Sequence, residues 1–215
     1  MATLAQMITR IADRLLDPNH TAITEVQIRE AVNEAIDFHK QETFWFNEFE
    51  ETVTLTADSK VLSLTTNTPL EIYEEGGVVI DYGSLYWNVR KVSTQKYDSE
   101  STQATGLPYM WTYRNDAFEL YFIPDQAYSC IVRGIKDYTA FDETGTDDAT
   151  SNDFTTEGER LIRYHALKSL AADYRQDLEM ATTFENREIA ELEKLREKTA
   201  NRVKTDTNSI NSTLL

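Results

Sequence analysis

The chain has 215 residues, of which 40% are hydrophobic and 11% aromatic, so it is expected to fold as a soluble protein with one domain of ordinary size and an appendage. Lys and Arg number 21 against 37 Asp and Glu, a formal charge of -16, so the chain lacks the cations that neutralise phosphate in sequence-specific DNA binding. A single cysteine, Cys130, excludes an internal disulfide framework, and the apolar runs are too short for a membrane helix. The N-terminus has no continuous apolar stretch of the signal-peptide kind, so no export is expected.

Two helices are predicted within residues 1–43. Apolar residues recur at the spacing of one helix face from Leu4 to Leu15, and a capping-box pattern at Thr3 precedes them. A second capping-box pattern begins at Thr24, whose hydroxyl can accept a hydrogen bond from the first turn of the next helix.

Residues 51–136 are predicted to form an antiparallel β region of about six strands, because apolar and polar residues alternate with a period of two. Turn residues suggest three hairpins, centred on residues 57–60, 83–84 and 114–116. The first would join the strand around Val53 to VLSL, the second VVIDY to LYWNVRKV, and the third YMWTY to FELYFI.

The rest of the chain reads as loop, helix and arm. Residues 137–153 are acidic and are interpreted mainly as a solvated loop, and residues 154–198 as one long helix that begins at a cap on Thr156. Residues 199–215 are polar and are predicted to be a flexible C-terminal arm. The expected fold class is therefore α+β: N-terminal and C-terminal helices form a helical bundle with β hairpins inserted between them, in a single domain of residues 1–198.

The sequence shows no nucleotide-binding, metalloprotease or EF-hand motif. His20, His39 and His165 lie far apart in the chain, and none has another His or Cys at ligand spacing, so neither a metal nor a cofactor is expected. Cys130 lies in an alternating strand without an adjacent base and is interpreted as an inert core residue.

One pair of carboxylates leaves an enzymatic alternative open. On an extended segment Glu48 and Glu50 would lie on one face roughly 6 to 7 Å apart, beside Trp45 as a platform for a sugar, which is the arrangement of a carbohydrate-active hydrolase. Solvated carboxylates beside structural aromatic residues are the competing interpretation, since acidic side chains are mostly exposed. A cytoplasmic protein-interaction module is a third hypothesis.

The stretch GLPYMWTYRNDAFELYFIPDQAYSCIVRGIKDY combines a proline-led strand, a short turn, a strand that ends at Pro124 and an aromatic return strand. Together with the helical pattern from Ile28 to Ile36 and the helix start DFTTEGERLIRYHAL at Asp153, it resembles the tailed-bacteriophage head-to-tail adaptor (connector, head-completion) protein family. The resemblance covers about the whole chain. It implies a structural virion protein of the neck, made in the host cytoplasm, without enzyme activity or cofactor.

The resemblance also implies partners. The chain would form a homo-oligomeric, dodecameric ring around a DNA channel, between the phage portal protein and a tail or nozzle protein. An acidic channel suits this role, because carboxylates repel packaged DNA, which would pass without specific binding. Ile210, Leu214 and Leu215 are apolar anchors in the predicted arm, and we expect them to bind the portal by β-augmentation.

Overall fold

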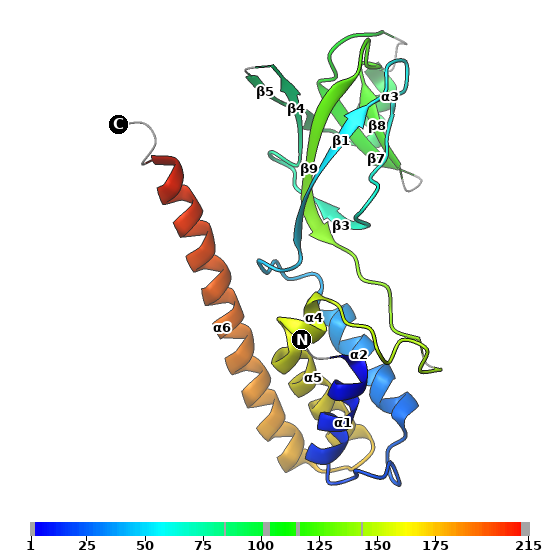
Figure 1. The fold of residues 1–215 in the computed structure, drawn as a ribbon, viewed down its shortest axis with the longest axis vertical. Coiled ribbons are helices and arrows are strands. Elements are labelled where there is room, and N and C mark those ends of the chain that lie inside the picture. The colour runs from blue at the N-terminus through cyan, green and yellow to red at the C-terminus, as the bar shows by residue number, and fades with distance from the viewer. Residues whose placement is uncertain (1–2, 84, 101–103, 115–116, 143, 212–215) are drawn as a thin grey trace. The chain divides into compact units, whose positions relative to one another are not determined.

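The computed structural model describes residues 3–83, 85–100, 104–114, 117–142 and 144–211 (Figure 1). These residues form six helices and two sheets whose strands pair mainly antiparallel, so the predicted mixture of helices and antiparallel strands is confirmed. The chain divides into two compact units: a helical unit of Met1–Asn47 with Tyr138–Leu215, and a β unit of Glu48–Asp137.

The helical unit contains five helices around an apolar core. They are α1 (Leu4–Arg14), α2 (Glu25–His39), α4 (Asp153–Thr156), α5 (Glu159–Asp173) and α6 (Leu178–Asn211). Both predicted capping boxes are present, at Thr3 with Gln6 and at Thr24 with Gln27. Within the described residues, no helix is both long and apolar enough to cross a membrane.

A buried carboxylate organises the loop between α1 and α2. Asp17 accepts hydrogen bonds from the hydroxyl and amide of Thr21 and from the amides of Ala22 and Ile23. These bonds hold the buried Ile23 next to the cap of α2, where it joins the same apolar core as Ile28. The loop therefore sets the start of α2.

The prediction of one long helix over residues 154–198 is wrong. Asn152, not Thr156, caps α4, and α5 ends before a reversal at Gln176, where φ is +53°. The Asp177 side chain then accepts a hydrogen bond from the Met180 amide in the first turn of α6. Neither Gly nor Pro marks the reversal, so no strong breaker residue indicates it in the sequence.

The arm predicted from residue 199 is also corrected, because α6 continues to Asn211. Once a helix is nucleated, each further residue adds a hydrogen bond for one fixed backbone, and no Gly or Pro interrupts α6. Ile210 is thus helical, whereas Leu214 and Leu215 lie outside the described residues.

The acidic loop is packed rather than simply solvated. Phe141 is buried, and its backbone amide and carbonyl both bind the Asn33 side chain of α2 at 2.9 Å. The carbonyls of Asp148 and Thr150 accept hydrogen bonds from the first amides of α1. The Asp148 carboxylate binds the buried Arg29 at 2.7 Å, so part of the loop's negative charge is neutralised by α2.

The described residues of the β unit form two sheets and one helix, α3 (Thr94–Glu100), which the sequence reasoning missed. One sheet has the order β1-β9-β4-β5 with β3 also paired to β9, and the other has the order β2-β8-β7-β6. Their bounds are β1 (Glu48–Leu55), β2 (Val61–Leu62), β3 (Pro69–Ile72), β4 (Val78–Tyr82), β5 (Leu85–Asn88), β6 (Arg90–Lys91), β7 (Met110–Arg114), β8 (Ala117–Tyr121) and β9 (Tyr128–Lys136). Side chains from both sheets share one core, as Ile80 and Cys130 of the first do with Trp111 of the second.

Two of the three predicted hairpins are confirmed, β4 with β5 and β7 with β8. The first is wrong: β1 pairs with β9, from Glu48 opposite Ile135 to Leu55 opposite Tyr128, and β2 pairs with β8. The pairing of β1 with β9 extends over eight matched positions, whereas β2 offers only two residues for pairing.

Candidate functional site

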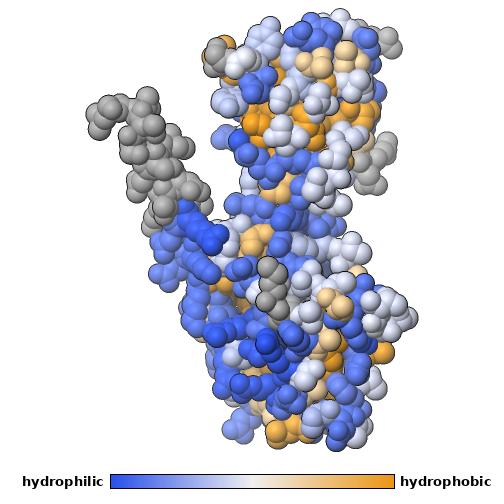
Figure 2. Space-filling model, in the orientation of Figure 1, coloured by the Kyte–Doolittle hydropathy of each residue, from blue (hydrophilic) through white to orange (hydrophobic). Residues whose placement is uncertain are grey.

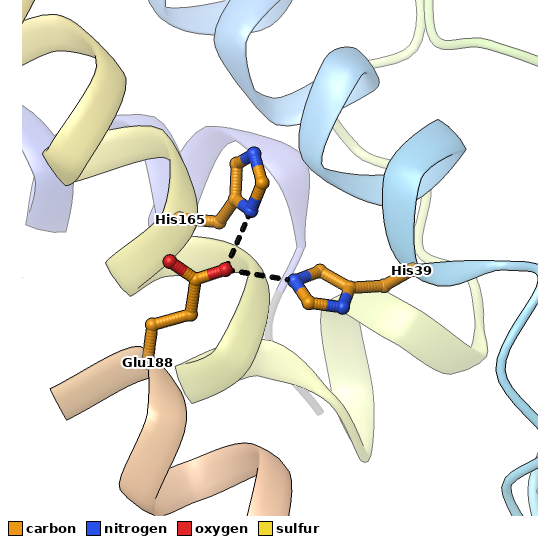
Figure 3. Close-up of side chains that lie close together, drawn as sticks. All are labelled: His39, His165 and Glu188. Atoms are coloured by element: carbon orange, nitrogen blue, oxygen red, sulfur yellow. Dashed lines mark hydrogen bonds and ion pairs between the residues drawn. The ribbon is translucent and has the colours of Figure 1, made fainter. Parts of the chain in front are cut away.

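Three polar side chains from three helices meet inside the helical unit (Figure 3). His39 is the last residue of α2, His165 lies in α5, and Glu188 lies in α6. The Glu188 Oε1 atom is 3.2 Å from His39 Nε2 and 2.7 Å from His165 Nδ1. We call these three residues the His-His-Glu cluster.

Helix packing places each member of the cluster. His39 comes one turn after the buried Ala35 and Ile36 of α2, and Glu188 comes one turn after the buried Phe184 of α6. The two helices α5 and α6 lie side by side (Figure 1), which brings His165 to Glu188. His39 and Glu188 therefore occupy inner-face positions of α2 and α6 at which the helical pattern would otherwise place apolar residues.

The Glu188 carboxylate is ionised in this environment. Burial raises the pKa of Glu188, but hydrogen bonds from His165, His39 and Lys168 outweigh burial and hold that pKa well below its usual value. The Lys168 ammonium lies 2.7 Å from Glu188 Oε2, the oxygen that the imidazoles do not contact. The ring of Phe38 packs against both imidazoles, with centroids 4.9 and 5.0 Å away.

The cluster has two chemical capabilities. It joins three helices through a buried, hydrogen-bonded network, and it brings two imidazole nitrogens and a carboxylate oxygen within 4.8 Å of one another, a donor set that suits a metal ion. Sequence reasoning missed it, because His39 and Glu188 are 149 residues apart. The sequence contained one indication of the cluster: His39 and Glu188 lie at the spacing of the buried apolar residues of α2 and α6.

The two carboxylates of the hydrolase hypothesis each have a structural partner. Glu48 and Glu50 lie on the same face of β1, as predicted, with the buried Phe49 between them on the other face. Glu48 accepts a hydrogen bond from the Tyr73 hydroxyl at 2.8 Å, and Glu50 forms an ion pair with Arg133 at 2.6 Å. These are contacts that stabilise the sheet.

The ring of Trp45, the supposed sugar platform, is contacted by two cations of α6. The Lys198 Nζ atom lies 4.3 Å and the Arg202 guanidinium carbon 4.9 Å from the ring centroid. The Trp45 amide also donates a hydrogen bond to the Thr199 hydroxyl. Trp45 therefore fastens α6 to the rest of the helical unit.

Cys130 is fully buried in β9, and burial raises the pKa of its thiol to about 12. Its predicted place in the core is confirmed. Of the predicted portal anchors, Ile210 lies near the end of α6, and the structure does not describe Leu214 and Leu215. Of the three predicted anchors, the described residues therefore include only Ile210.

The β unit exposes apolar side chains along one strand. All four residues of β5 are exposed, including Leu85 at 68% and Tyr86 at 71% of their surface, with Trp87 and the nearby Tyr82 about half exposed. Within the described residues β5 is the last strand of its sheet. We call Tyr82, Leu85, Tyr86 and Trp87 the β5 edge, because exposed apolar edge strands tend to pair with or pack on another chain.

A protein-family comparison decides the identity: the family model described as "SU10 adaptor protein" matches residues 2–211, which include nearly all of both units. The chain belongs to the SU10 adaptor protein family. This is a family of structural phage proteins, not of enzymes, so the predicted resemblance to phage adaptors is confirmed. Comparison with curated proteins gives no match.

Membership of the SU10 adaptor protein family makes this a virion protein whose partners belong to the phage head-tail complex. For such an adaptor, surfaces matter more than a reactive centre. The described part of α6 presents a mainly hydrophilic surface in Figure 2, whereas the β5 edge is apolar. The two units thus offer surfaces of different chemistry for contacts with other chains.

Proposed function

We propose that this adaptor forms a dodecameric ring at the phage neck, which joins the portal to a tail or nozzle protein and lines part of the DNA channel. The family match across residues 2–211 supports this role more than any other observation. A closed ring satisfies the same head-to-tail contact on every subunit and leaves no free interface, whereas a contact that does not close would produce filaments.

The β5 edge supports assembly. Three exposed apolar side chains on the edge strand β5, with Tyr82 at the end of the neighbouring β4, would be a liability in a protein that remained monomeric. In the ring, we propose, a neighbouring subunit covers them. Main-chain groups of the edge strand and the aromatic side chains of Tyr86 and Trp87 would then contribute to one heterologous contact.

The charge of the chain supports a channel that does not retain DNA. The formal charge is -16, and several of the described arginines are bound to carboxylates, as Arg114 is to Glu119 and Arg196 to Glu42. Cations neutralised in this way contribute less to phosphate binding. Packaged DNA would therefore pass without specific binding, and free duplex DNA is expected to bind weakly.

We further propose that the C-terminal end contacts the portal through Ile210, Leu214 and Leu215. Helix α6 continues for about nine residues beyond Arg202, roughly 13 Å at the rise of an α-helix, and includes Ile210. Ile210 would meet the portal from this helix rather than from an extended strand.

Immunogold electron microscopy of purified virions tests the neck position. Antibodies raised against the chain are expected to label the junction of capsid and tail, while an antibody against the major capsid protein labels the shell of the same particles. Gold at the tail tip or over the capsid, or no labelling of opened particles, would contradict the proposal.

A further inference from the structure

We propose that the His-His-Glu cluster binds one divalent transition-metal cation, with Zn²⁺ preferred, through His39 Nε2, His165 Nδ1 and the Glu188 carboxylate. Two imidazole nitrogens with one carboxylate oxygen form a donor set that zinc uses widely, with bonds of about 2.0 to 2.2 Å. The three donor groups already face one another in Figure 3. Mg²⁺ and Ca²⁺ prefer oxygen donors, so they should not compete.

The distances within the cluster are close to those that a tetrahedral ion requires. In tetrahedral geometry, bonds of about 2.0 to 2.2 Å separate neighbouring ligand atoms by roughly 3.3 to 3.6 Å. Glu188 Oε1 lies 3.2 Å from His39 Nε2 and 2.7 Å from His165 Nδ1, and all three donor atoms lie within 4.8 Å of one another. To admit an ion, Glu188 Oε1 and His165 Nδ1 would have to move apart by about 0.6 Å.

Lys168 is the positive group that a metal must tolerate. Its ammonium binds Glu188 Oε2, so Oε1, which faces both imidazoles, remains available to the ion. Lys168 is also 28% exposed, which lets water screen its charge. One carboxylate can therefore bind the cation with one oxygen and the ammonium with the other.

Solvent reaches the cluster from the side of α5. The His165 side chain is 12% exposed, whereas that of His39 is 1% exposed. Because His165 is partly exposed, solvent water would supply the fourth ligand, as in zinc sites with three protein ligands. The ligands would come from α2, α5 and α6, so the cation would cross-link three helices.

The surroundings of His39 limit the affinity. Its Nδ1 atom is buried and has no hydrogen-bond partner among the described residues, although metal-bound histidines usually donate their second N–H to a neighbour. Loss of such a partner typically costs about 10- to 100-fold in affinity. We therefore expect a moderate site, and the titration should extend well above equimolar metal.

Titration of the untagged full chain, stripped of metal with a chelator and dialysed, tests the proposal. Isothermal calorimetry should show one saturable equivalent of Zn²⁺, and Co²⁺ should give the visible absorption of a four-coordinate site. At a free Zn²⁺ concentration of a hundred times Kd, Tm should rise by about 5 to 10 °C, while Mg²⁺ should have no effect.

His165→Gln and Glu188→Gln should abolish the single equivalent, whereas His20→Gln, outside the cluster, should retain it. Circular dichroism and a cooperative melt establish that each variant is folded before titration. If the cluster variants do not fold, the stoichiometry and the Co²⁺ spectrum of the natural chain decide. Failure of the natural chain to bind either metal would overturn the proposal, and so would undiminished binding by a folded His165→Gln variant.

Discussion

The Glu51 carboxylate accepts five hydrogen bonds from one short loop. Its donors are the amide and hydroxyl of Thr65, the amide of Thr66, and the amide and side chain of Asn67, at 2.6 to 3.0 Å. Glu51 itself is buried in β1, and the loop connects β2 to β3. A single side chain therefore satisfies the polar groups of a connection between the two sheets.

Glu51→Gln should lower the free energy of unfolding by about 1 to 3 kcal/mol, because the amide nitrogen of Gln cannot accept these hydrogen bonds and leaves buried donors unpaired. The neighbouring Glu50→Gln is the matched control: Glu50 is exposed, and its loss should cost less than about 0.5 kcal/mol. Urea denaturation measures both. Equal losses would show that the loop does not depend on Glu51.

The same carboxylate makes stability depend on pH. Burial raises the pKa of Glu51, but the hydrogen bonds from Thr65, Asn67 and Thr66 outweigh burial and lower that pKa to about 2. A lowered folded-state pKa stabilises the fold above the unfolded value of 4.5, and this stabilisation is lost as pH falls through the folded value.

The advantage of the natural chain over Glu51→Gln should thus be complete above about pH 5 and shrink, by an amount on the order of 2 kcal/mol, as pH falls towards 2. Urea denaturation of both chains at several pH values measures this difference. A difference that stayed constant over the range would contradict the assigned role of the Glu51 charge.

At the scale of single residues, the sequence predicted contacts between residues that are close in the chain. It did not predict contacts between residues that are far apart in the chain. The caps at Thr3 and Thr24 depend on residues three positions apart, and both are confirmed. His39, His165 and Glu188 meet only because three helices pack together, and no spacing in the chain reports that. Sequence reasoning therefore did not anticipate the His-His-Glu cluster, although the chain contains all three residues.

At the scale of elements, one face of α6 packs against the rest of the helical unit. Ala181, Phe184, Glu188 and Leu195 are buried at helical spacing, and contacts of Thr199, Lys198 and Arg202 with Trp45 follow. Helix α6 continues beyond Arg202 to Asn211 and includes Ile210, which we propose as a portal contact.

Truncation after Arg202 should leave the free energy of unfolding within about 0.5 kcal/mol of the natural value and weaken co-sedimentation with portal rings. Truncation after Leu195 is the control, because it removes the Trp45 contacts and should lower Tm. If the chain truncated after Arg202 sediments with portal as well as the natural chain does, Ile210, Leu214 and Leu215 are dispensable.

The β5 edge is the element on which assembly is expected to depend. Leu85→Ser with Tyr86→Ser should leave Tm nearly unchanged, since both side chains are exposed, but should reduce ring formation on the portal at least tenfold, the effect of about 1.4 kcal/mol per contact. Val61→Ser, at an exposed position of β2 in the other sheet, is the control. Mass photometry counts the rings, and full assembly of the double variant would exclude this edge from the interface.

The strand pairings differ in whether the sequence could predict them. The turn of the β4-β5 hairpin contains Gly83, whose φ is +69°. The sequence predicts this turn because glycine adopts a positive φ readily. The pairing of β1 with β9 joins Val53 to Cys130 across most of the β unit, and alternation alone cannot choose between β9 and a nearer strand.

For the whole molecule, each unit has its own apolar core, and the inserted β unit begins and ends at adjacent positions of β1 and β9, with Glu48 opposite Ile135. Apart from α3, which lies in the β unit, the predicted segregation of helices from strands follows from this insertion. The number of subunits in the assembly depends on the contact between chains.

Mass photometry of the purified chain mixed with portal rings from the same phage tests the ring most directly. We predict that each portal gains about twelve times the 24.7 kDa mass of the chain, without intermediate plateaus. Portal that gains no mass, or a chain that remains monomeric or forms a two-fold dimer when portal is present, would contradict the proposed adaptor ring.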